Sequence, residues 1–343
     1  MVLVLAGIGA MQWGASRASS ALDAYRDRVG LRGVVMGALL GIATAAPEIS
    51  VNLASMAFGW PDLGLGAALG SNVPALPLVF LIAWLSLRAT ASQPETTAMA
   101  SGSVAEKTAV PVVAPEAVEV QALPYLLVVL LLAALTLPPG WAGLQPIDAL
   151  LLVAAWGVYL ARALLRPHRP AEPDPEPQSE AGPAPASASA AGTLIGRAAL
   201  LAVPAIALGA LASVIAARRL GEAFGASDLV VGLFVIGLLC ALPEGFAAWR
   251  LAREGKTTTA VSTAMADGIV SLTVALVSPA LAGAAVGDAA LYLTNLAYLV
   301  FALLTYITFN HFRWGQELDF ARVSLFVGGY IVYLGVVAYL LAR

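Results

Sequence analysis

Long apolar runs recur along almost the whole chain and leave few polar positions between them. Ten of these runs approach the roughly 20 residues that a helix needs to cross about 30 Å of hydrocarbon. They cover residues 2–19, 33–58, 63–88, 122–138, 145–166, 194–217, 228–252, 258–282, 286–309 and 320–342. Only 11% of the 343 residues are charged and 60% are hydrophobic, so the chain lacks the polar surface of a soluble protein. The sequence predicts an all-α polytopic membrane protein with ten transmembrane helices, embedded in the lipid bilayer.

Two segments between the runs differ in composition from the rest of the chain. Residues 92–121 and 167–193 carry little apolar periodicity, and the second is rich in Pro, Ala, Ser and Glu. Such a composition cannot bury enough apolar surface to fold, so 167–193 is expected to be a disordered linker. The linker divides the chain into residues 1–166 and 194–343, with five runs each. The first run lacks a basic segment ahead of it and is interpreted as a retained span.

The distribution of Lys and Arg predicts the orientation. If the N-terminus lies outside, the loops after runs 1, 3, 5, 7 and 9 are cytoplasmic and hold 15 of the 18 basic residues. The opposite side holds Arg218, Arg219 and Arg343. We therefore expect both termini outside and the linker in the cytoplasm. No basic patch remains for nucleic acid, and the short loops suggest a bacterial inner membrane. The oligomeric state stays open, and a monomer is plausible.

The two halves resemble one another in sequence. Residues 34–76 align without a gap on residues 230–272, which brings Pro47-Glu48 onto Pro243-Glu244 and Gly70-Ser71-Asn72 onto Ala266-Asp267-Gly268. Because each half has an odd number of spans, the second half enters the membrane from the opposite side. The sequence therefore predicts two inverted five-helix repeats, an arrangement in which transporters hold their ions near the membrane midplane.

Glu48 and Glu244 lie deep inside apolar runs. A carboxylate at that depth costs at least about 2.5–3.5 kcal/mol on insertion scales, so it is retained where it meets a cation, a proton or a partner. The proline before each glutamate removes a backbone donor and frees the carbonyl one turn earlier, at Ala43 and Leu239. We expect each helix to break at Pro-Glu and to offer carboxylate and carbonyl oxygens together, the ligands that Ca²⁺ prefers.

Other polar side chains in the runs can complete such a site. Asp267 is a third intramembrane acid, and Thr44, Ser71, Asn72 and Ser271 are candidate sources of neutral oxygens. Hydroxyl groups in membrane helices also commonly bond to their own backbone, and this alternative stays open for these residues. Asn52, one turn after Glu48, is expected to orient it. Asn295 is expected to join two helices.

Several kinds of site are excluded by the residues themselves. His168 lies in the linker and His311 at the end of a run, and Cys240 is the single cysteine, so the histidine and cysteine clusters of zinc sites are missing. There is no Gly-rich phosphate loop and no nucleophile elbow. Intramembrane aspartyl catalysis needs two aspartates at one water, whereas the paired acids here are glutamates. No enzyme activity and no cofactor are predicted.

These motifs resemble the two α-repeats of the cation/Ca²⁺ exchanger superfamily, in which Gly-Thr-Ser-x-Pro-Glu is followed by Gly-Ser-Asn-Ile-x-Asn or Asp. The resemblance covers both halves and implies ten helices, four of them around the ion site, with spans 1 and 6 sliding as gates. It also implies exchange of Ca²⁺ for Na⁺ or H⁺. By motif position, Glu48 and Glu244 match the two central glutamates, Thr44 the threonine and Ser71 the serine.

The chain departs from the family motifs at several of the oxygen-bearing positions. Ala43 replaces a glycine, Cys240 a threonine, and Ala45 and Ala241 replace serines, while Ala75 and Ser271 stand where the family has Asn or Asp. Asp267 supplies an acid one helical turn earlier. Because Na⁺ sites in this family use those hydroxyls, a divalent cation or protons are favoured over several Na⁺ ions. The sequence predicts a cation antiporter; a monovalent cation exchanger and a non-transporting relative with a vestigial site are the alternatives.

Overall fold

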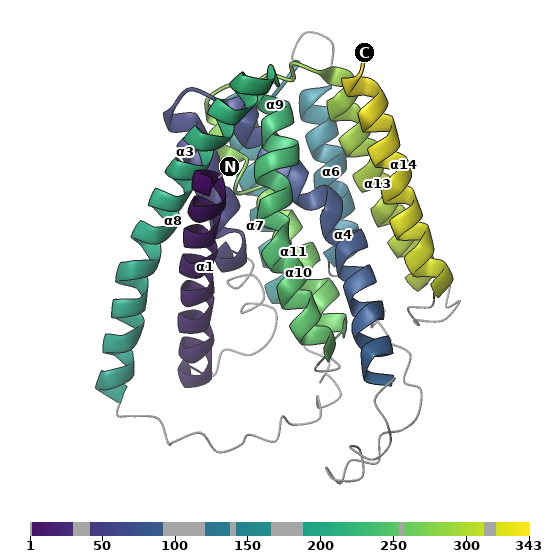
Figure 1. Ribbon diagram of the computed structural model, residues 1–343. Coiled ribbons are helices and arrows are strands. Elements are labelled where there is room, and N and C mark those ends of the chain that lie inside the picture. The colour runs from purple at the N-terminus through teal and green to yellow at the C-terminus, as the bar shows by residue number, and fades with distance from the viewer. Residues whose placement is uncertain are drawn as a thin grey trace.

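The computed structural model describes residues 2–29, 42–91, 121–137, 142–165, 188–253, 257–311 and 320–343, and these residues are almost entirely helical. Figure 1 shows the helices running side by side between two faces of the molecule. In chain order the elements are α1 (Val2–Val29), α3 (Ala46–Ala57), α4 (Pro61–Ala91), α6 (Leu123–Thr136), α7 (Asp148–Leu165), α8 (Ala188–Phe224), α9 (Asp228–Val231), the π-helix η3 (Gly232–Gly237), α10 (Leu238–Arg253), α11 (Thr257–Ser271), α12 (Val277–Leu281), α13 (Ala289–His311) and α14 (Phe320–Leu341).

Every predicted apolar run contains at least one of these helices. Five described helices are long and apolar enough to span a membrane by length and composition alone: Pro61–Ser86, Leu200–Phe224, Asp228–Arg253, Ala289–Phe309 and Phe320–Leu341. The helix α8 begins at Ala188, inside the segment 167–193 that was predicted to be a linker. The rest of that segment up to residue 187, and residues 92–120, lie outside the described residues.

Within the described residues, three of the ten runs are interrupted, and they are the runs that carry the three intramembrane acids. The second run bends at Ala45 before α3, the seventh contains η3 between α9 and α10, and the eighth turns at residues 272–276 between α11 and α12. Non-helical or widened backbone at membrane depth is tolerated where it is buried in protein. These three interruptions therefore mark the region where the backbone itself is available to a ligand.

The predicted break at Pro-Glu is confirmed in the first half and wrong in the second. In the first half, the bend at Ala45 lies two residues before Pro47. In the second half, α10 runs from Leu238 to Arg253 without a break at Glu244, and the irregular turn is η3, which ends at Gly237. A membrane helix can continue through a proline where neighbouring helices and local backbone adjustments satisfy the freed carbonyl.

The two halves meet where α4 crosses η3 with their backbones in contact. A Cβ atom on Gly70 would overlap the Leu233 carbonyl group, and one on Gly237 would lie 2.6 Å from the Gly70 Cα atom and 2.7 Å from the Ser71 nitrogen. Gly66 and Gly232 contact each other's helices in the same way. Small residues allow membrane helices to approach this closely. The crossing lies directly beside Ser71.

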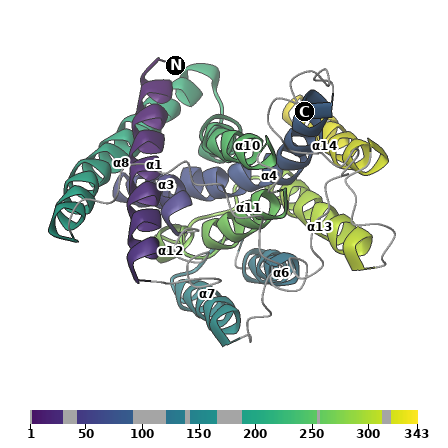
Figure 2. The same ribbon diagram turned by 90° about the horizontal axis from the view of Figure 1, so that it is seen from below.

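The helices α1 and α8 form a separate antiparallel pair at one edge of the molecule. Figure 2 shows the pair to one side of α4, α10 and α11. Gly7 packs against Gly209 and Ser213, and Gly14 packs against Ala202, so that the two backbones lie close together along much of their length. The pair contacts the rest of the protein through α3, α9, η3 and α10. It is thus a unit distinct from the crossing of the two repeats.

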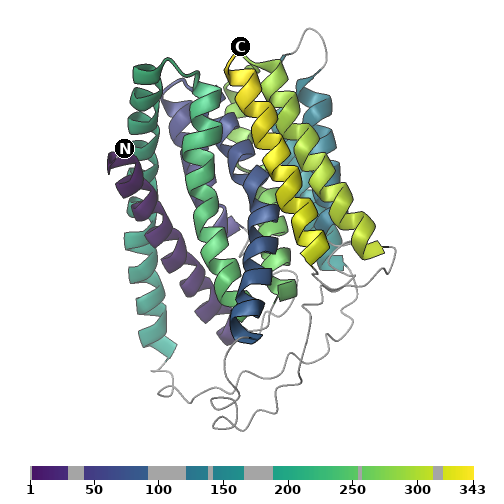
Figure 3. The ribbon, with the colours of Figure 1, turned by 45° about the vertical axis from the view of Figure 1, so that its right-hand side comes forward.

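On the other side of the crossing, α6, α13 and α14 enclose the remainder of the core. Figure 3 shows α13 and α14 lying next to one another in front of α6. Phe80 of α4 packs against Tyr306 of α13 and Phe326 of α14, with ring centroids 5.8 and 4.5 Å apart. A short antiparallel bridge between Gly143 and Ala285 joins the loop before α7 to the loop before α13. Asp62 accepts a hydrogen bond from the Ala285 N–H at 2.9 Å.

The glycine crossing predicts that Gly70→Ala is strongly destabilising. Its Cβ atom would lie 2.7 Å from two backbone atoms of Leu233, so the helices would have to separate. Overpacking of this kind lowers the free energy of unfolding by about 1–3 kcal/mol or more. We expect a lower unfolding temperature in detergent. The matched control is Gly157→Ala in α7, whose Cβ would meet nothing within 4 Å and whose helix propensity improves. Equal unfolding temperatures for the two variants would contradict the crossing.

Candidate cation-binding site

Three intramembrane acids converge beside the crossing of α4 and η3. Glu48 lies in the first turn of α3, Glu244 in α10 and Asp267 in α11. Glu48 and Asp267 are each 2% exposed, and Glu244 is partly buried. One carboxylate oxygen from each of the three lies within 4.8 Å of the other two. The structure thus brings all three acids predicted from the sequence into one cluster.

The cluster holds oxygens that have no protein donor. Glu48 Oε2, Glu244 Oε2 and Asp267 Oδ1 are buried and have no hydrogen-bond partner among the described residues. Two unit charges at such a separation repel by roughly 3 kcal/mol at an effective dielectric constant of about 20. Asp267 also lies within hydrogen-bonding range of Glu244, a contact that two carboxylates keep when a proton or a cation lies between them. The cluster is therefore built to hold positive charge, as protons or as a cation.

The residues predicted to supply neutral oxygens differ in the hydrogen bonds that they make. The Thr44 hydroxyl lies within hydrogen-bonding range of Asp267. The Ser71 hydroxyl donates to the Ala68 carbonyl at 3.1 Å, which leaves its lone pairs unused by that bond. Ser271 is fully buried one turn after Asp267, and its hydroxyl has no partner among the described residues. Ala43 is buried, and its carbonyl cannot accept from Pro47, which has no N–H.

Two asparagines of the same region are engaged by the protein itself. The Asn72 amide donates to the Ala68 carbonyl at 2.6 Å, and its oxygen accepts from the Tyr125 hydroxyl at 2.5 Å. Asn52 donates to the main-chain carbonyl of Glu48 at 2.8 Å, so it contacts the backbone of the acid rather than its carboxylate. Both amides thus brace the helices that carry the site residues.

Comparison with known proteins identifies the family. The family model described as sodium/calcium exchanger protein matches residues 1–165 and 197–339. The chain belongs to the sodium/calcium exchanger family. It is therefore a membrane cation antiporter and not an enzyme. A comparison with curated protein sequences found no match.

Solved structures of the sodium-calcium exchanger NCX_Mj have the same fold. One, soaked with 100 mM Na⁺ and 10 mM Sr²⁺, has a TM-score of 0.60 and 19% identity, with 97% of this chain and 96% of that chain covered. Another, soaked with 2.5 mM Na⁺ and 0.1 mM Ca²⁺, has a TM-score of 0.59 and 19% identity, with 96% of each chain covered. At this identity the likeness establishes the fold of an exchanger and leaves the transported ions to be argued from the residues.

Sequence reasoning missed one residue that touches the exchanger's candidate site. Tyr125 of α6 is 1% exposed, and its hydroxyl lies within electrostatic range of Glu244 and Asp267. The available signal was a tyrosine at the beginning of an otherwise aliphatic run, Leu123-Pro-Tyr-Leu-Leu. Because α6 carries no motif of the repeats, nothing in its own sequence indicated that it approaches the acids.

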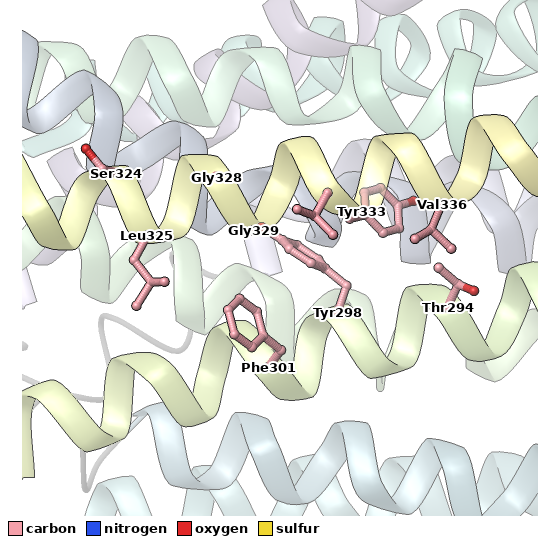
Figure 4. A pocket seen from close by; sticks show the side chains of 10 residues that line it. Thr294, Tyr298, Phe301, Ser324, Leu325, Gly328, Gly329, Tyr333 and Val336 are labelled. Atoms are coloured by element: carbon pink, nitrogen blue, oxygen red, sulfur yellow. The ribbon is translucent and has the colours of Figure 1, made fainter.

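A groove elsewhere in the exchanger differs from the acid cluster in character. It lies between α13 and α14, has a volume of about 470 Å³ and is lined by Thr294, Tyr298, Phe301, Ser324, Leu325, Gly328, Gly329, Val332, Tyr333 and Val336 (Figure 4). None of these residues carries a charge, so the groove lacks the carboxylates that distinguish the acid cluster. The predicted role of Asn295 as a helix contact is confirmed here, since it accepts a hydrogen bond from Tyr333 at 2.8 Å.

Repulsion within the acid cluster predicts an unusual effect of Asp267→Asn. Without divalent cations at pH 8, the variant should unfold at a higher temperature than the parent, because one buried charge is removed. Its free energy of unfolding should be higher by on the order of 1 kcal/mol. The stabilisation that Ca²⁺ gives the parent should shrink at the same time. Thermal unfolding in detergent, with and without Ca²⁺, measures both effects.

Asp148→Asn is the matched control for this substitution. Asp148 is as buried as Asp267 but accepts a 2.7 Å hydrogen bond from the Gln145 N–H. Its replacement should lower stability by about 1–3 kcal/mol and leave the Ca²⁺ response unchanged. A destabilised Asp267→Asn with an undiminished response to Ca²⁺ would place the cation elsewhere.

Proposed function

We propose that this protein exchanges Ca²⁺ for H⁺ or Na⁺ across the membrane, with the acid cluster as its ion site. In this proposal Glu48, Glu244 and Asp267 are the charged ligands. Neutral oxygens come from Thr44, Ser71, Ser271 and the Ala43 carbonyl, while Asn72 holds the wall of the site. The observation that carries the proposal is the convergence of three carboxylates within 4.8 Å, each with an oxygen that has no partner among the described residues. Hard oxygen donors of this kind suit Ca²⁺.

Competition between ions for the acids supplies the coupling. Bound Ca²⁺ and protons on the same carboxylates exclude one another, because each neutralises the charge that attracts the other. The contact between Asp267 and Glu244 supports H⁺ as the counter-ion, since one proton can bridge the two carboxylates once the cation has left. Na⁺ is the second candidate, and it is supported by the family and by the Na⁺ soaks of NCX_Mj.

Alternating access in this proposal comes from the pair α1 and α8 moving across the rest of the protein. The pair is packed tightly within itself, at Gly7 and Gly209 above all, and forms a unit beside the crossing of α4 and η3. Such a unit can shift without disturbing the glycine contacts beside Ser71. The ion then remains at a fixed site while access changes from one side to the other.

The proposed orientation has both termini outside. On the side expected to be cytoplasmic, Arg17 stacks on Trp13 and Arg88 on Trp84. On the opposite side, Arg218 stacks on Trp60 at 4.2 Å. Aromatic and basic side chains of this kind lie at membrane interfaces, and the greater number of basic residues belongs inside. A bacterial inner membrane and a monomer remain the simplest setting for the proposed exchange.

Radioactive Ca²⁺ uptake into proteoliposomes tests the proposal. An imposed pH gradient, and separately an imposed Na⁺ gradient, should drive uptake, and the stronger driving gradient names the counter-ion. Glu48→Gln/Glu244→Gln should reduce uptake to the level of empty liposomes, because two of the three charged ligands are lost. Asp148→Asn is the control for correct insertion.

Two other outcomes separate the alternatives. If folded, inserted protein takes up no Ca²⁺ under either gradient, Ca²⁺ exchange is refuted. A Na⁺-driven pH change inside the same liposomes, read with a trapped dye, then supports monovalent exchange through the same acids. If that signal is also missing, and the glutamine variant has unchanged stability in all cations, the site is vestigial.

A further inference from the structure

The two repeats differ sharply at one matched pair of positions beside the acids. Asn72 in the first repeat corresponds to Gly268 in the second. A Cβ atom on Gly268 would lie 2.5 Å from Asn72 Oδ1, 2.5 Å from the Tyr125 hydroxyl and 2.6 Å from Tyr125 Cζ. The missing side chain next to Asp267 thus leaves room for a hydroxyl group that comes from α6, a helix outside both motif segments.

That hydroxyl begins a chain of hydrogen bonds that ends at Ser71. Tyr125 donates to Asn72 Oδ1, and Asn72 Nδ2 donates to the Ala68 carbonyl at 2.6 Å. The same carbonyl accepts from the Ser71 hydroxyl at 3.1 Å, and Asn72 Nδ2 lies 3.5 Å from Ser71 Oγ. The Tyr125 bond fixes which end of the Asn72 amide faces Ser71, because only an oxygen can accept from the phenol.

We propose that Tyr125 is a positioning residue of the cation site, acting through Asn72 on the Ser71 hydroxyl. With the amide oriented by Tyr125, the Ser71 hydroxyl donates its hydrogen bond to the Ala68 carbonyl, and its lone pairs point away from that bond. Without Tyr125, the amide can rotate and offer its oxygen to the Ser71 proton, so the hydroxyl loses its fixed direction. The inference rests on the proposed function, in which Ser71 supplies a neutral oxygen to the cation.

The structure contains a second copy of the same arrangement on α13 and α14, two helices that carry none of the three acids. Tyr333 of α14 donates to Asn295 Oδ1 at 2.8 Å, and Asn295 Nδ2 donates to the Leu291 carbonyl at 2.7 Å. Both asparagines are buried, at 3% and 0% exposure, and both bond the carbonyl four residues earlier. A phenol-to-amide bond lost at Tyr333 therefore has the same structural cost as one lost at Tyr125, without any consequence for the cation.

The experiment compares Tyr125→Phe with Tyr333→Phe in full-length protein. Ca²⁺ uptake is measured as a function of Ca²⁺ concentration, together with the Ca²⁺-dependent shift in unfolding temperature. Tyr125→Phe should raise the half-saturating Ca²⁺ concentration about fivefold, as expected for one lost hydrogen bond, with the maximal rate within about twofold of the parent. Tyr333→Phe should leave the half-saturating concentration unchanged, while both variants lower the unfolding temperature without Ca²⁺ by similar amounts.

Asn72→Ala removes the next residue in the same chain of hydrogen bonds. It provides a second test in case Tyr125→Phe has a folding defect. It should weaken Ca²⁺ binding about as much as Tyr125→Phe, and the double variant should be no weaker than either single one, because the residues act in series. Asn295→Ala is its control. Equal Ca²⁺ dependence for Tyr125→Phe, Tyr333→Phe and the parent overturns the positioning role while the proposed function stands. A parent without any response to Ca²⁺ overturns both.

Discussion

The close crossing of α4 and η3 determines where every other part of the site can lie. At Gly70 and Gly237 the two backbones touch, which is possible only because neither residue has a side chain. Ser71 follows Gly70 immediately on α4, and Glu244 follows Gly237 two turns later, in α10. The contact therefore joins the two halves of the chain at the depth where their acids lie. A looser crossing would separate Glu244 from Glu48 and leave each as an isolated charge in an apolar surrounding.

The irregular backbone around the acid cluster is tolerated because it is buried in protein. Around the acids, Thr44 and the turn after Ser271 lie at interruptions of helices, where main-chain groups lack regular partners. Asn52 and Asn72 donate to main-chain carbonyls in the same region. Buried amides that satisfy the backbone in this way leave the carboxylate oxygens free, which separates the groups that maintain the fold from those that can bind a cation.

The sequence was informative wherever a residue belonged to a repeat. The ten apolar runs, the inverted halves and the convergence of Glu48, Glu244 and Asp267 follow from periodicity, alignment and the cost of a buried charge. What could not be predicted depends on contacts between helices. The π-helix ahead of α10 reflects packing against α4 and not a signal at Pro243, and Tyr125 approaches the acids from a helix with no motif. Whether Asn72 bonds a cation or a phenol is likewise decided by a neighbour 53 residues away.

The two repeats carry different ligand residues at matched positions, and this difference affects how the proposed exchange is coupled. The backbone repeats itself, but Thr44 is matched by Cys240 and Ser71 by Asp267, so the second half carries two of the three acids. Three carboxylates and one Ca²⁺ leave one negative charge, and a single Na⁺ would leave two. A buried site that retains net charge is costly. Protons on Glu48, Glu244 and Asp267 neutralise the same charges once the cation has left, so they can replace Ca²⁺ at the site. The acid at position 267 thus favours proton coupling in the proposed exchange, because it adds a group that a proton can neutralise.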